Sequence, residues 1–131
     1  MTPSLEEALR LLRLAQRDLQ TYRILAAHPD ASLAATCFHA QQSVEKALKA
    51  VLTARRATFP RTHNLEELGL LVTEIGIGLP APGRDLRRLT PFAVDFRYDE
   101  ETVGLITTEA AGLLAESVFQ WARVLIEATR Q

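Results

Sequence analysis

The sequence has few of the cysteine and histidine residues that small metal-binding or disulfide-bonded proteins need. Its 131 residues include a single cysteine, Cys37, so no disulfide can form within the chain. The three histidines are His28, His39 and His63; they are not at the paired spacing of metal ligands, and no second cysteine could complete a zinc site. We therefore expect no metal and no cofactor.

Long apolar runs are also absent. No stretch approaches the roughly 18 residues that a membrane-spanning helix needs. Near the start of the chain, Glu6 and Glu7 stand where a secretory signal would carry basic residues. The sequence thus predicts a cytoplasmic protein that does not associate with membranes.

The chain also lacks a large excess of either positive or negative charge. The formal net charge is -1, which gives no overall reason to bind a polyanion. Aromatic residues make up 6% of the chain, and no basic run alternates with them as in proteins that bind single strands. There is no strong nucleic-acid signal. The two lysines are Lys46 and Lys49, and arginine supplies the rest of the positive charge.

The composition is that of a globular protein, with 47% hydrophobic and 24% charged residues. A chain of this length suits one domain around one core, so we expect a single domain over residues 1–131. No alternating run of β-branched residues bounded by turns predicts a strand. The sequence indicates an all-α fold.

Helical spacing of apolar residues predicts four principal helices and a short one. Their expected ranges are about 3–27, 31–56, 64–75, 85–96 and 107–129, with Pro91 tolerated in the fourth only by a kink or a break. Short connections make consecutive helices antiparallel. The predicted architecture is an up-and-down four-helix bundle with an additional short helix.

For the third helix and the last one, the spacing of apolar residues predicts which side is buried. In the third helix the buried side is Leu65, Leu68, Leu71, Val72 and Ile75. In the last helix it is Ala110, Leu113, Leu114, Val118, Trp121, Leu125 and Ala128.

The second helix carries the most informative pattern, HAQQSVEKALKAVL from His39 to Leu52. At about 100° per residue, one arc of this helix is polar and the opposite arc, which includes Cys37, is apolar. We therefore expect Cys37 to be buried and inert. The polar arc consists of His39, Gln42, Glu45, Lys46 and Lys49.

This polar arc has two interpretations. Glu45 with Lys49, and Gln42 with Lys46, are four residues apart and form ordinary helix-surface pairs worth about 0.2–0.5 kcal/mol each, which suits a structural network or a dimer interface. Alternatively, Gln42, Glu45 and Lys49 face Arg97 and Tyr98 in a polar pocket where Lys46 or Lys49 meets a phosphate.

The order of the motifs resembles that of the HEPN domain family in its small stand-alone prokaryotic form. The motifs are HAQQSVEKALKAVL, then THNLEEL after a proline, then DFRYDE, then an Ala-rich final helix. The resemblance covers nearly the whole chain. It implies a bundle of four or five helices that is usually a homodimer and is often encoded beside a minimal nucleotidyltransferase, in some cases as a toxin and antitoxin pair.

One branch of this family cleaves RNA without a metal, using an arginine, a polar neighbour and a histidine four to six residues on. In this chain the matching segment, from Arg97 to Gly104, contains no histidine. His63 with Arg61 or Arg97 offers the required acid–base group and cation. The competing interpretation is structural: His63 precedes the helix cap Asn64, and its ring bonds the loop backbone.

Three functions stay open at this point. The first is a nucleotide-binding or accessory subunit of a nucleotidyltransferase; the chain itself lacks the Gly-Ser and spaced aspartates of the transferase, so a partner would supply them. The second is a metal-independent ribonuclease toxin, and the third a ligand-free interaction module. A non-enzymatic role is favoured over an enzymatic one.

Overall fold

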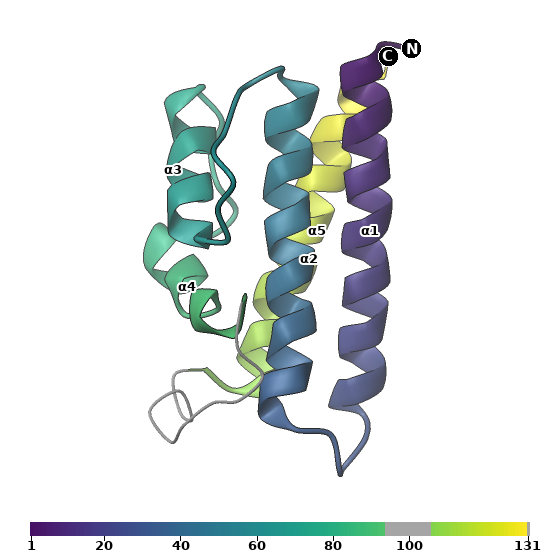
Figure 1. The fold of residues 1–131 in the computed structure, drawn as a ribbon, viewed down its shortest axis with the longest axis vertical. Coiled ribbons are helices and arrows are strands. Elements are labelled where there is room, and N and C mark those ends of the chain that lie inside the picture. The colour runs from purple at the N-terminus through teal and green to yellow at the C-terminus, as the bar shows by residue number, and fades with distance from the viewer. Residues whose placement is uncertain (94–105, 131) are drawn as a thin grey trace.

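A computed structural model of the protein describes residues 1–93 and 106–130, which are all helical apart from their connections. The elements are α1 (Pro3–Ala26), α2 (Leu33–Ala54), α3 (Leu65–Glu74), α4 (Gly83–Arg87), the 3-10 turn η1 (Thr90–Ala93) and α5 (Thr108–Thr129). Figure 1 shows α2 at the centre, with α1 on one side of it and α3 and α4 on the other. The helical bundle with an additional short helix is confirmed.

Each of the four longer helices begins with a side chain that caps it. Thr2, Ser32, Asn64 and Thr107 each accept a hydrogen bond from the backbone amide three residues on, at 3.0–3.1 Å. Such a cap satisfies an amide that has no partner within the helix and stabilises it by about 1 kcal/mol. The helix starts are therefore set by local chemistry.

Left-handed residues end α2 and α3. Gly76 follows α3 with φ of 88°, and the amide of Ile77 donates to the carbonyl of Val72 at 3.3 Å. Arg56 plays the same part after α2 with φ of 57°, a conformation that costs a non-glycine residue about 1 kcal/mol. The chain then turns back along α2 toward α3.

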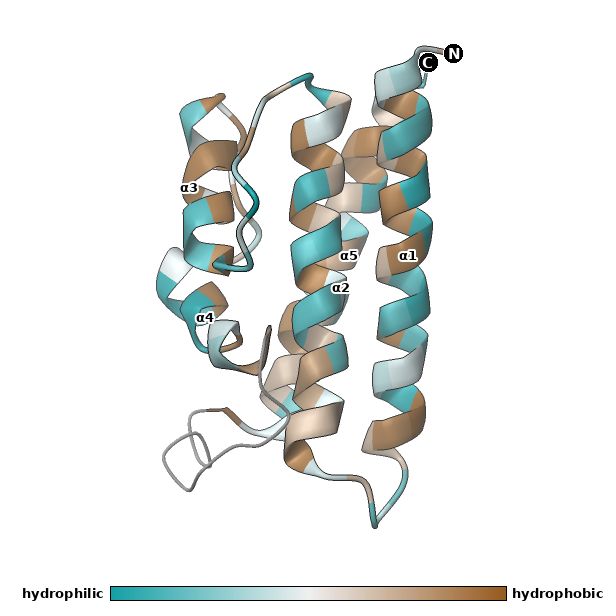
Figure 2. Ribbon diagram, in the orientation of Figure 1, coloured by the Kyte–Doolittle hydropathy of each residue, from teal (hydrophilic) through white to brown (hydrophobic). Residues whose placement is uncertain are grey.

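The core surrounds α2. In Figure 2 the hydrophobic residues of the long helices lie mainly toward the interior and the hydrophilic ones outward. Cys37 is fully buried, as predicted, and burial raises its pKa to about 11, so its thiol is not ionised at neutral pH. The largest fully buried side chains include Phe92, Leu19, Leu48, Leu52, Leu65, Leu68, Leu86 and Ile126.

The close approach of α1 and α5 depends on a glycine. The Tyr22 hydroxyl of α1 donates to the carbonyl of Thr108 at 2.6 Å and lies directly over Gly112. A Cβ at Gly112 would be 2.1 Å from that hydroxyl oxygen. A side chain here would force the Tyr22 ring to move and would disturb its bond to Thr108.

The predicted buried side of α5 is partly wrong. Leu113 is 73% exposed and Ala128 is also exposed. Four of the seven innermost positions of α5 are alanine or glycine, which lets the helix approach its neighbours closely: Ala111, Gly112, Ala115, Val118, Phe119, Ala122 and Ile126. In α3, Ile75 is 39% exposed because the helix has ended at that residue.

The predicted helix over 85–96 is interrupted before Pro91, in line with the expected break, and its first part begins earlier, at Gly83. The chain forms α4 and then a separate 3-10 turn that contains Pro91, because proline has no amide to continue a helix. Residues 94–96 lie outside the described ranges.

The connection after α3 is anchored on α5. The Trp121 indole nitrogen donates to the carbonyl of Gly78 at 2.9 Å. Separately, no helix in residues 1–93 and 106–130 is long and apolar enough to span a bilayer.

Candidate functional site

The polar arc of α2 divides between two sides of the helix. Glu45 and Lys49 face the segment 57–63, which leads to α3, whereas His39 and Lys46 reach Asp18 of α1. The predicted pair Glu45–Lys49 forms, with Lys49 Nζ 3.0 Å from a Glu45 carboxylate oxygen. Gln42 bonds Gln41 instead of Lys46, so the second predicted pair is wrong.

Glu45 is the centre of the first group, and its side chain is only 6% exposed. The carboxylate accepts hydrogen bonds from Gln41 Nε2 at 3.0 Å, from Lys49 Nζ at 3.0 Å and from His63 Nδ1 at 2.9 Å. We call Gln41, Glu45, Lys49 and His63 the Glu45 cluster. Three donors around one buried carboxylate are the arrangement that keeps such a group ionised.

Two opposing effects act on the pKa of Glu45. Burial raises it, but the hydrogen bonds from Gln41, His63 and Lys49, together with the charge of Lys49, outweigh burial. The net result is a pKa below the usual value for glutamate. Glu45 is therefore a carboxylate at neutral pH.

Gln41 is the member of the cluster that the sequence did not reveal. It is fully buried, and its amide nitrogen also donates to the backbone carbonyl of His63, at 3.3 Å. Its place four residues before Glu45 was the available signal, since such pairs meet on one helix face. Gln41 fastens the segment before α3 to the middle of α2.

The ring of His63 has a different partner from the one predicted. It bonds the Glu45 carboxylate and not the loop backbone. Because an ionised carboxylate only accepts, Nδ1 must carry the proton, and Nε2 of a neutral ring is then an acceptor. The side chain of His63 is 57% exposed, so most of the ring is open to solvent.

Beside this histidine lies a hollow of about 330 Å³. It is lined by Lys49, Phe59, Pro60, Arg61, Thr62 and His63. The lining has two cationic side chains and no carboxylate, and Phe59 adds an aromatic surface. Lysine and arginine next to a polar ring are the groups that bind phosphate.

The second group is built on Asp18, whose side chain is 14% exposed. One carboxylate oxygen is 3.0 Å from His39 Nδ1, and the other accepts from Lys46 Nζ. We call Asp18, His39 and Lys46 the Asp18 cluster. It joins α1 to α2, and Asp18 was not among the predicted site residues.

Two of the predicted site residues, Arg97 and Tyr98, lie outside the described ranges, so their predicted contact with Glu45 stays a prediction. Within residues 1–93 and 106–130, no group of three or more His, Cys, Asp and Glu side chains is placed to hold a metal ion.

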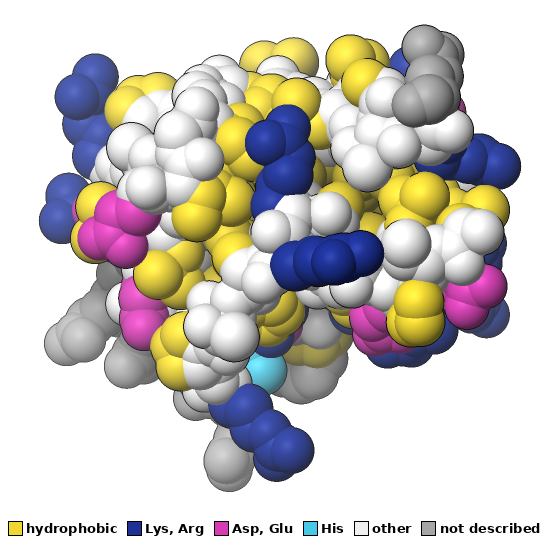
Figure 3. Space-filling view, turned by 90° about the horizontal axis from the view of Figure 1, so that it is seen from above, with side chains coloured by type: hydrophobic (Ala, Val, Ile, Leu, Met, Phe, Trp, Pro, Cys, Tyr) yellow, Lys and Arg dark blue, Asp and Glu magenta, His cyan; other side chains and the backbone are white. Residues whose placement is uncertain are grey.

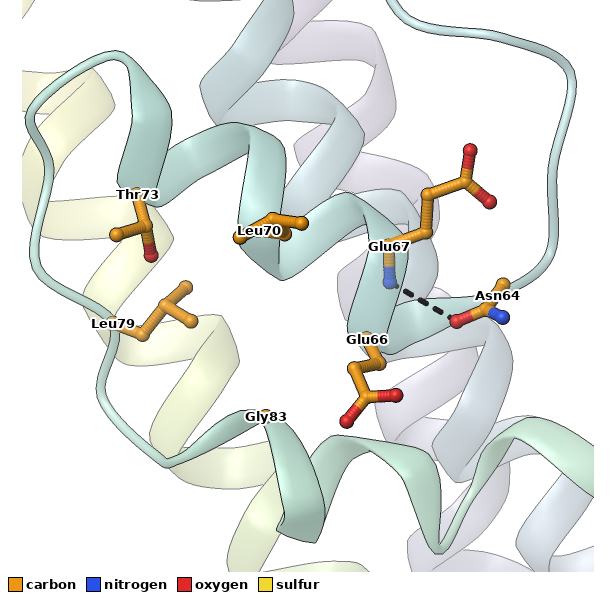
Figure 4. Close-up of a pocket in the computed structure, with 7 residues that line it drawn as sticks. All are labelled: Asn64, Glu66, Glu67, Leu70, Thr73, Leu79 and Gly83. Carbon is orange, nitrogen blue, oxygen red and sulfur yellow. Dashed lines mark hydrogen bonds between the residues drawn. The ribbon is translucent and has the colours of Figure 1, made fainter.

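A larger hollow, of about 500 Å³, lies between α3 and the chain leading into α4. Figure 4 shows that Glu66 and Glu67 border it, together with Leu70 and Leu79. Two carboxylates and no cation make it unfavourable for a phosphate group. Size alone therefore does not identify the site.

Comparison with known proteins gives one match. The model of the family described as the HEPN domain matches residues 8–129. No curated protein and no solved structure matches the chain.

Proposed function

Because the chain belongs to the HEPN domain family, we propose that it binds a nucleotide, as an accessory subunit to a minimal nucleotidyltransferase. The observation that carries this proposal is the Glu45 cluster, which holds Lys49 and His63 at the edge of a hollow that also contains Arg61.

In this proposal the nucleotide phosphates contact Lys49 and Arg61, and the ring of Phe59 offers a face to the base. Glu45 does not contact the ligand. It fixes the position of Lys49 and His63 before binding, which lowers the entropic cost of ordering them.

Substitution of one lysine, with the other as control, tests the site. Lys49→Ala and Arg61→Ala should each weaken nucleotide binding by about tenfold or more, because each removes a charge-assisted contact. Lys46→Ala should not, since Lys46 is held by Asp18 on the other side of α2. Isothermal titration with ATP and AMP measures this; equal affinity in Lys49→Ala, Arg61→Ala and the unmodified protein would refute the site.

The same proposal includes a nucleotidyltransferase partner and a homodimer of this protein. The two proteins would act in the cytoplasm as a toxin and antitoxin. An affinity pull-down of the tagged protein from its native cell should recover a small nucleotidyltransferase in near-equal amount. Leu113 and Val124, which are 73% and 59% exposed on α5, support a homodimer. Recovery of the protein alone, as a monomer, would count against both.

A second candidate function is metal-independent RNA cleavage, which the bond between Glu45 and His63 favours. A carboxylate that orients a histidine at Nδ1 leaves Nε2 ready for proton transfer, and Arg61 is close enough to line the same hollow. RNA cleavage lost in His63→Ala and kept in His39→Ala would support this function; cleavage kept in both would place it elsewhere.

A further inference from the structure

A groove of about 440 Å³ lies between α1 and α5 and shares no residue with the Glu45 cluster or its hollow. It lies near the end of the bundle where both chain termini are found (Figure 1). Farther along the same two helices, Arg23 of α1 bonds Glu116 of α5, with Nε 2.8 Å from the carboxylate. That exposed ion pair links the two helices beyond the groove.

The groove carries an excess of positive charge. Arg13 from α1, Arg123 from α5 and Arg130, which follows the last residue of α5, line it against a single carboxylate, Glu127. Glu127 is 3.4 Å from Arg123 Nη1. Arg13 and Arg130 form no ion pair with any carboxylate of residues 1–93 and 106–130. Figure 3, a view onto this end, shows basic side chains spread over it and acidic ones only toward its edges.

The groove is also partly apolar. Leu9, Leu12 and Phe119 line it, and Leu12 and Phe119 are 8% and 5% exposed, so only their edges reach the groove. An apolar body placed over these edges would gain about 25 cal/mol for each Å² removed from water. The volume is within the range of pockets for small ligands.

From these features we propose that the groove binds a phosphate monoester with a compact apolar or aromatic body. Three guanidinium groups against one carboxylate leave two positive charges in excess, which matches the charge of about -1.5 to -2 on a phosphate monoester at pH 7. Guanidinium forks from two helices suit the phosphate oxygens. The apolar edges take the rest of the molecule.

The test is a titration of the isotopically labelled protein with benzyl phosphate, followed by NMR. Inorganic phosphate and benzyl alcohol serve as probes for the charge alone and the ring alone. Backbone signals of residues 9–16 and 119–130 should shift and saturate with benzyl phosphate, which should bind about tenfold more tightly than either control.

Substitutions locate the contacts. Arg13→Gln and Arg130→Gln should each weaken benzyl phosphate binding by about tenfold, while Glu127→Gln should tighten it because Arg123 is released. Both arginines are exposed, so folding should persist, which circular dichroism checks. Arg84→Gln, on α4, is the matched control and should leave the affinity unchanged.

Three results would overturn the inference. Shifts confined to residues 57–63 would place the ligand in the hollow beside His63, supporting the proposed function and removing this one. Equal affinity for inorganic phosphate would show that the apolar edges contribute nothing. Absence of saturable shifts would show that there is no site, whatever ATP does at Lys49.

Discussion

The Glu45 and Asp18 clusters contain the same chemical groups, a carboxylate with a histidine and a lysine, on two sides of α2. The Asp18 cluster joins two long helices, and its histidine is 27% exposed. The Glu45 cluster joins a helix to a connecting segment, and its histidine is 57% exposed beside a hollow. The same groups thus lie between two helices in one place and beside a solvent-open hollow in the other.

Removing each carboxylate in turn should give the largest difference in stability between the two clusters. Glu45→Ala should lower the free energy of unfolding by about 3 kcal/mol, because it removes the carboxylate that accepts from Gln41 and Lys49 in a buried setting. Asp18→Ala should cost about 1–2 kcal/mol, because its partners can reach water. Urea unfolding followed by circular dichroism measures both. Equal losses would mean that the two clusters do not differ in burial cost.

Acid should weaken the Glu45 cluster. The pKa of Glu45 is lower in the folded than in the unfolded chain, so its stabilisation is complete above the unfolded pKa of about 4.3 and is lost as pH falls through the folded value. The stability difference between Glu45 and Glu45→Gln proteins should therefore shrink below about pH 4.5. Urea titrations of the two proteins measure this difference; a difference that stays constant to pH 3 would contradict the lowered pKa.

The histidines should give the smallest effects and the sharpest contrast. His63→Ala should change the free energy of unfolding by less than about 0.5 kcal/mol, because most of its side chain is in water. His39→Ala should cost about 1 kcal/mol, since that ring lies between α1 and α2. Thermal unfolding of both variants checks the order. The reverse order would make His63 the structural histidine.

The helices were predictable because their signals are local. Thr2 and Asn64 cap helices through the backbone three residues away, and Pro91 interrupts a helix through its own missing amide. The buried side of α5 was not fully predictable. Ala111 and Ala115 are buried and Leu113 is exposed because of how α2 packs against the helix, and the spacing of apolar residues does not show this.

The geometry of the candidate site was predictable in part for the same reason. Glu45 and Lys49 are neighbours on one helix, so their pairing follows from spacing. The bond from His63 to Glu45 joins residues 18 apart in sequence, and Asp18 meets Lys46 across 28 residues, so both depend on how the chain folds back. No local pattern carries that information.

The hydrogen bond between Trp121 and Gly78 gives the protein an internal spectroscopic probe. Trp121 is the single tryptophan in the sequence, and its indole nitrogen is bound to the connection that follows α3. Its fluorescence therefore reports whether that connection is attached to α5, separately from the helical signal of the whole bundle. An emission change that precedes loss of helicity during unfolding would reveal that the half of the molecule containing α3 and α4 detaches first.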